Sequence, residues 1–161
     1  MLSIKPHHFV DIITALGEGR TQYEPHPYGH ALHSVAAAIL ADRSLCLRIE
    51  LGADDVCRPC RHNLEGLCDD TIDTSYRPLA PKSKREWNLL LDQRWSARLG
   101  LAQGDCLTAL DLCRRIQERA GDITDIYREV PGERTAHRQA SLAKGVARYT
   151  GAAGTGLAAT P

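Results

Sequence analysis

The sequence predicts a single α+β domain that is mostly helical, with a short strand region and a cysteine-rich metal-binding loop. Three observations favour this fold class: apolar residues recur at helical spacing in several segments, one segment alternates apolar and polar residues, and four of the six cysteines fall within residues 46–68. A length of 161 residues suits one domain. We expect the domain to span residues 1–149, with residues 150–161 as a flexible tail.

The N-terminal third is expected to contain two helices and one strand. The first helix, over residues 4–16, is indicated by apolar residues that share one face: Phe9, Ile12, Ile13 and Leu16. Gly17-Glu18-Gly19 ends this helix and lacks the pattern of a dinucleotide-binding turn. Residues 31–40 hold four alanines and predict a second helix. Residues 45–51 alternate apolar and polar side chains from Leu47 onwards, which is typical of a half-buried strand.

Helices are also expected in the second half of the chain. Ser83 is suited to cap a helix that stops at Gly100 and whose apolar stripe comprises Trp87, Leu90, Leu91, Trp95 and Leu99. Thr108 and Asp111 have the spacing of a capping box, in which each side chain satisfies a free backbone amide. The later segments are a helix over residues 109–120, a short helical turn within 122–130 and a polar helix over 133–149.

Charge and hydropathy narrow the function classes. Lys plus Arg and Asp plus Glu number 20 each, so the chain has no cationic excess for gripping nucleic acid or acidic membranes. Residues 114–148 are rich in arginine but also in acids, as in a solvated helix face. No apolar run is long enough for a membrane span, and no secretion signal precedes the first helix. We therefore expect a cytoplasmic protein with a redox or protein partner.

The cysteines point to a metal, because disulfides are rare in a reducing compartment. Their spacing is Cys46-x10-Cys57-x2-Cys60-x7-Cys68, and the central Cys-x-x-Cys lets two thiolates from one turn bind a single centre. Residues 52–81 hold few large apolar groups, so a bound metal is expected to order them. The remaining two cysteines, Cys106 and Cys113, are interpreted as small core residues.

Spacing favours an iron–sulfur cluster, with zinc or free redox thiols as alternatives. A zinc ribbon has a second Cys-x-x-Cys, whereas Cys68 stands alone. Zinc would take Cys57, Cys60, His62 and Cys68, but one residue between Cys60 and His62 makes that set awkward. A [4Fe–4S] cluster tolerates irregular spacing. By strand parity, Cys46 can equally face the cluster or the core.

The adjacent pair His7-His8 lies at the start of the first predicted helix. We expect one ring to face inward and the other outward, where an imidazole donates to a cluster sulfide or carries a proton; both are candidate catalytic residues. Three further histidines are interpreted as surface or capping residues: His26, His30 and His33.

Several motifs together resemble Domain of Unknown Function family 1284, which comprises small presumed iron–sulfur proteins. The resemblance covers roughly residues 4–118 and is carried by Lys5-Pro6-His7-His8-Phe9-Val10-Asp11, Gly17-Glu18-Gly19, Asp54-Asp55-Val56-Cys57-Arg58-Pro59-Cys60, Cys68, and residues 99–104 and 107–108. It implies Cys57, Cys60 and Cys68 as cluster ligands. The family has a cysteine where this chain has Asp11, so the fourth ligand is Asp11, Cys46 or an open position.

The sequence thus favours an iron–sulfur protein with a [4Fe–4S] cluster, in electron transfer or cluster-dependent catalysis. Such a protein acts as an iron–sulfur-dependent enzyme or as an oxidoreductase component. The alternative is a structural zinc-binding module that presents a surface to a protein partner and performs no chemistry.

Overall fold

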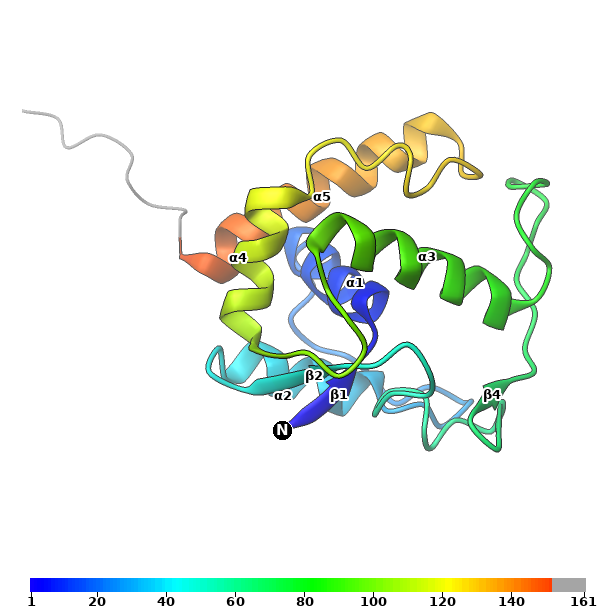
Figure 1. Ribbon diagram of the computed structural model, residues 1–161, viewed down its shortest axis with the longest axis horizontal. Helices are drawn as coiled ribbons and strands as arrows, with labels where there is room; N and C mark the ends of the chain where they lie inside the picture. The colour runs from blue at the N-terminus through cyan, green and yellow to red at the C-terminus, as the bar shows by residue number, and fades with distance from the viewer. Residues whose placement is uncertain (152–161) are drawn as a thin grey trace, which may run out of the picture.

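The computed structural model describes residues 1–151, which form an α+β fold of five helices and five short strands (Figure 1). The helices are α1 (Pro6–Gly17), α2 (Leu32–Ala41), α3 (Lys84–Leu99), α4 (Ala109–Arg119) and α5 (Gly132–Thr150). Helix α1 is central and contacts both α5 and α3. None of the helices in this described range combines the length and the apolar run needed to cross a bilayer.

A three-stranded mixed sheet supports the N-terminus of α1. Its strands are β1 (Leu2–Ile4), β2 (Cys46–Ile49) and β5 (Cys106–Thr108), with β2 in the middle. Strand β1 runs parallel to β2, and β5 runs antiparallel to it. Ile4, Leu47 and Ile49 are fully buried, so the sheet contributes one face to the core.

A separate two-stranded hairpin lies in the long connection between β2 and α3. Strands β3 (Asn63–Leu64) and β4 (Leu67–Cys68) pair antiparallel, with Asn63 opposite Cys68. The two residues between them, Glu65 and Gly66, have φ values of 52° and 89°. Positive φ at both central positions is the geometry of a tight hairpin turn, which brings Cys68 back toward the preceding loop.

The helix boundaries follow the local signals in the sequence. The Ser83 hydroxyl accepts a hydrogen bond from the Glu86 amide, and Gly100 ends α3 with a left-handed φ of 64°. The Thr108 hydroxyl accepts from the Asp111 amide at 3.0 Å and so caps α4. The predicted caps at Ser83 and Thr108 are therefore confirmed. Only one half of the predicted capping box is formed, because the Asp111 carboxylate accepts from the Thr108 hydroxyl at 2.7 Å.

Four local predictions need correction. The first helix begins at Pro6 rather than at residue 4, because Ile4 pairs with Ile49 in β1. Residues 122–130 contain turns and no helix, because the Asp122 side chain bonds the Thr124 amide and hydroxyl. Cys106 is exposed on the edge strand β5, not in the core. Helix α5 includes Thr150 and is capped by Gly151, which are the first two residues of the predicted tail.

The predictions for Cys113, for the second helix and for the strand are confirmed. Cys113 is fully buried in the core, as expected. The second predicted helix and the predicted strand appear as α2 and β2 with small changes at their ends. The remainder of the predicted tail, residues 152–161, lies outside the described residues.

Candidate metal site

A turn and a hairpin bring three cysteines toward one place. The amide of Cys60 donates to the carbonyl of Cys57 at 3.0 Å, which closes the Cys-x-x-Cys turn. The amide of Asn63 then donates to the carbonyl of Cys60 at 2.9 Å, and Asn63 pairs with Cys68 across the hairpin. Local backbone bonds alone therefore place the third cysteine beside the first two.

These three cysteines line a cavity of about 310 Å³. Three histidines line it as well, namely His8, His30 and His62. Its ionic lining is mainly cationic, with Lys5, Lys84 and Arg85 against the single acid Asp70. The cavity therefore combines thiols and imidazoles, which bind metals, with positive charge that favours an anionic occupant.

Three helices begin at the rim of this cavity. Lys5 is the N-cap residue of α1, Leu32 is the first residue of α2 and Lys84 is the first residue of α3; all three line the cavity. The N-terminus of a helix carries a partial positive charge and free amide donors. The backbone thus adds to the positive potential of the lysines and of Arg85.

The other three cysteines and Asp11 do not line this cavity. Cys46 sits in β2 opposite Thr108, Cys106 is exposed, and Cys113 is in the core. The Asp11 carboxylate is 2.6 Å from the guanidinium of Arg138 on α5. Of the predicted cluster ligands, the structure therefore brings together Cys57, Cys60 and Cys68, and it places Cys46 and Asp11 elsewhere.

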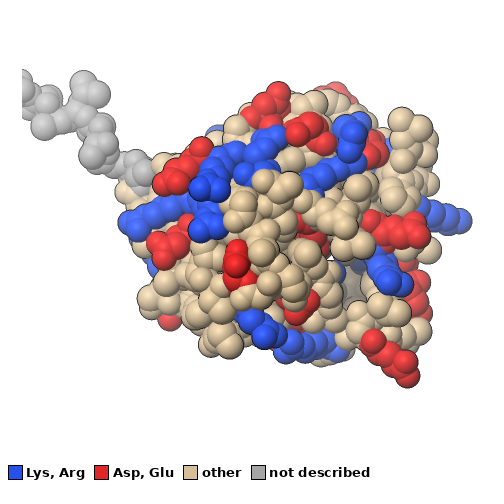
Figure 2. All heavy atoms as spheres, in the orientation of Figure 1, with Lys and Arg blue, Asp and Glu red and all other residues tan. Residues whose placement is uncertain are grey.

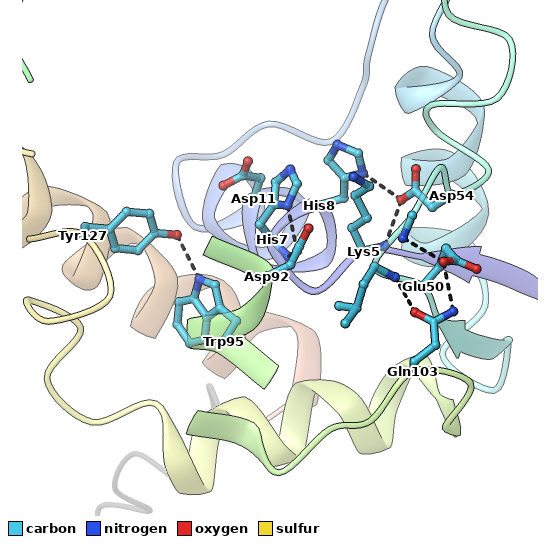
Figure 3. A network of polar contacts seen from close by, with 12 residues as sticks. Lys5, His7, His8, Asp11, Glu50, Asp54, Asp92, Trp95, Gln103 and Tyr127 are labelled. Atoms are coloured by element: carbon cyan, nitrogen blue, oxygen red, sulfur yellow. Dashed lines mark hydrogen bonds and ion pairs between the residues drawn. The ribbon is translucent and has the colours of Figure 1, made fainter. Parts of the chain in front are cut away.

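His7 and His8 point toward different carboxylate partners (Figure 3). His7 is 4% exposed, and its Nδ1 lies 2.8 Å from Oδ1 of the buried Asp92 on α3. Burial by itself lowers the pKa of His7, but the charge and hydrogen bond of Asp92 outweigh it and raise the pKa above its ordinary value. His7 is the inward ring and joins α1 to α3, whereas the partly exposed His8 lies at the cavity.

His8 is held by a carboxylate that also holds the cysteine turn. Its Nδ1 lies 2.7 Å from Oδ2 of Asp54, which also accepts the Lys5 amide at 2.8 Å. The other oxygen of Asp54 accepts the Cys57 amide at 3.0 Å. Burial raises the pKa of Asp54, but His8 and these amide bonds hold it well below its ordinary value. A buried, ionised Asp54 thus couples the start of α1 to the first cysteine.

Asp55 reinforces this connection on the neighbouring strand. Its carboxylate accepts the Ser3 amide at 2.7 Å, and its own amide donates to the Ser3 carbonyl at 3.2 Å. The Asp54-Asp55 pair therefore fixes the cysteine turn against the chain segment that leads into His8. Sequence reasoning used these two acids only as part of the family resemblance. It missed the contact of Asp54 with His8, which lies 46 residues away in the chain.

His8, Asp54 and Cys57 each offer a ligand atom within 4.8 Å of the other two. Within residues 1–151 no other group of three His, Cys, Asp or Glu side chains comes this close together. Burial first, and then the charge of Asp54, raise the pKa of Cys57 to about 12. The Cys57 thiol therefore keeps its proton in the absence of a metal, and binding one releases that proton.

The two remaining histidines of the cavity differ in their partners. His62, which sequence reasoning offered as a zinc ligand, places Nδ1 2.8 Å from the half-exposed Asp69 and accepts from Nε of Arg61 at 3.4 Å. His30 was interpreted as a surface or capping residue, but its Nδ1 is buried without a hydrogen-bond partner. Its ring stacks on that of His26 with centroids 4.4 Å apart.

Comparisons with protein-family models, curated proteins and solved structures find no match to this chain. The function is therefore inferred from the residues that line the cavity.

Proposed function

We propose that this protein binds a [4Fe–4S] cluster through Cys57, Cys60 and Cys68 and works in electron transfer or cluster-dependent catalysis. The observation that carries the proposal is the convergence of these three cysteines on one cavity that the other three do not reach. A bound cluster would supply one-electron transfer, or Lewis acidity at an iron with an open position.

The charge of the cavity supports an anionic cluster. A [4Fe–4S] centre with thiolate ligands carries net negative charge, because the thiolates outweigh the charge of the cluster core. Lys5 and Arg85 line the cavity, the charge of Lys84 is offset by its ion pair with Asp70 at 2.8 Å, and three helices begin at the rim. These groups would lower the free energy of an anionic occupant, and they oppose a bare cation.

The spacing of the thiols favours a cluster over one ion. Tetrahedral zinc at a Zn–S distance of about 2.3 Å holds its sulfurs about 3.8 Å apart. The Sγ atoms of the three cysteines do not all lie within 4.8 Å of one another in the described chain. A cluster binds each thiolate through a separate iron and so accepts the wider spacing.

The loop around the cavity is poorly supported by packing. Between residues 51 and 83, only Asp54, Val56 and Ala80 are buried. The hairpin exposes Leu64 and Leu67, at 55% and 49%. A metal centre would supply the stabilisation that this segment does not obtain from apolar burial.

A zinc-binding interaction module is the second candidate. The observation in its favour is the close approach of His8, Asp54 and Cys57, whose ligand atoms are near enough to share one ion. Such a module predicts one zinc per chain, a colourless protein and unfolding on chelation.

Anaerobic purification and reconstitution test the proposal. The wild type should be brown, with broad visible absorbance that bleaches on reduction. Replacing Cys57, Cys60 or Cys68 with Ser should lower the iron and sulfide content, whereas Cys46→Ser and Cys106→Ser should leave it unchanged. Zinc without iron would favour the interaction module, and a wild type free of both metals would refute both candidates.

A further inference from the structure

Three cysteines leave one position of the proposed centre without a protein ligand. Neither Asp11 nor Cys46 lines the cavity, and the Asp11 carboxylate is already paired with Arg138. The remaining nitrogen ligands at the cavity are His8, His30 and His62. The hydrogen-bond partners of these three histidines differ, and this difference indicates which of them can bind the metal.

His8 has the arrangement of a metal-binding histidine. In proteins such a histidine donates its second ring N–H to a carboxylate or a carbonyl, which fixes the tautomer and the direction of the ring. Nδ1 of His8 lies 2.7 Å from the fully buried Asp54 (Figure 3), so Nε2 is the ring nitrogen left for a metal. His8 also lines the cavity together with the three cysteines.

His62 and His30 fit this role less well. Nε2 of His62 already accepts a hydrogen bond from Nε of Arg61 and is therefore not free for a metal. Its carboxylate partner Asp69 is 51% exposed, which makes the orientation of the ring less fixed. His30 has no carboxylate partner, and its ring stacks on that of His26.

We infer that Nε2 of His8 is the fourth protein ligand of the centre and that Asp54 is the positioning residue for it. The inference rests on the proposed function and deepens it by naming the ligand set as three cysteines and one histidine. Asp54 suits this role because the same carboxylate also accepts the amides of Cys57 and Lys5. The buried Asp54 carboxylate thus positions both the Cys57 sulfur ligand and the His8 nitrogen ligand.

Pulsed EPR of the reduced, reconstituted protein tests the assignment. Samples with ¹⁴N- and ¹⁵N-labelled histidine should show a strongly coupled histidine nitrogen in the wild type. His8→Ala should lose this coupling, whereas the matched variants His30→Ala and His62→Ala should keep it.

Two further variants separate ligation from structure. His8→Cys should restore the cluster content without nitrogen coupling and lower the reduction potential, because histidine in place of cysteine raises it. Asp54→Asn should change the nitrogen coupling and weaken metal binding by about 10–100-fold. Asp55→Asn is the control: Asp55 also bonds the N-terminal strand but is not bonded to His8, so the coupling should remain as in the wild type.

The outcomes distinguish the two proposals. A wild type that holds a metal but shows no histidine nitrogen overturns the assignment of His8 and leaves the metal centre intact. Unchanged coupling in His8→Ala has the same meaning. A wild type that binds neither iron nor zinc, which elemental analysis shows before any spectroscopy, refutes the proposed function and the His8 assignment with it.

Discussion

Gly17 of α1 and Gly145 of α5 lie against each other, so the two helices meet through their backbones. A Cβ atom at Gly145 would lie 1.8 Å from the carbonyl oxygen of Ile13 and 3.1 Å from the amide nitrogen of Gly17. A Cβ atom at Gly17 would lie 1.8 Å from the carbonyl oxygen of Ser141. Helix α1, which carries His8 at its start, is thus fixed by a contact that tolerates no side chain.

Gly145→Ala should destabilise the protein by about 3 kcal/mol, because the helices must separate to admit a methyl group. Urea denaturation followed by circular dichroism measures this change. Gly132→Ala is the matched control at the start of α5, where an added Cβ meets no atom within 4 Å. Equal midpoints for the two variants would contradict the close helix contact.

Tyr127→Phe should cost about 1–3 kcal/mol of unfolding free energy. The indole N–H of the fully buried Trp95 donates to the Tyr127 hydroxyl at 3.1 Å, and the substitution leaves that donor without a partner. Urea denaturation provides the measurement. Tyr76→Phe, in the less buried loop before α3, should change stability much less.

The ion pair between Glu129 and Arg94 should stabilise the folded protein at neutral pH. Both oxygens of its carboxylate accept from Arg94, each at 2.8 Å, and these bonds lower the pKa of Glu129. Because the folded pKa lies below the unfolded one, this stabilisation is complete above about pH 4.3 and is lost as pH falls through the folded pKa. Glu129→Gln should therefore destabilise the protein by about 1–3 kcal/mol at neutral pH.

Denaturation curves from pH 7 to pH 3 check the sign of this effect. The difference in stability between wild type and Glu129→Gln should shrink as the pH falls. Glu118→Gln, a change on the exposed face of α4, should follow the wild type throughout. A difference that grows toward low pH would refute the role given to the pair.

Metal loading should slow hydrogen exchange in residues 57–70 more than in the core helices. This segment contributes all three cysteines that line the cavity, and it has little buried apolar surface of its own. Mass spectrometry of the loaded and metal-free protein gives the comparison, with peptides from α5 as the internal control. Equal protection of residues 57–70 in both forms would argue against a centre held there.

The sequence indicated the features that depend on near neighbours. The caps at Ser83 and Thr108 and the stop at Gly100 each use bonds within a few residues, so their residue types reveal them. The nearness of Cys57, Cys60 and Cys68 follows in the same way from a turn and a hairpin. The mixed charge of the arginine-rich segment was also predicted from the sequence. Figure 2 shows positively and negatively charged side chains intermixed over the visible face.

Features that join distant segments were not predictable. Strands β1 and β5 have three residues each, which is too short for a repeating apolar pattern in the sequence. Both strands form through pairing with β2. The exposure of Cys106 follows from its place on an edge strand. The contact between His8 and Asp54 joins the start of α1 to the cysteine turn, and only the folded chain brings them together.

The most direct test of the metal centre is the content of iron, acid-labile sulfide and zinc in protein purified without oxygen. The proposed cluster predicts about four irons and four sulfides per chain and no stoichiometric zinc. Protein that remains free of iron and sulfide after anaerobic reconstitution, while keeping its fold by circular dichroism, would contradict it.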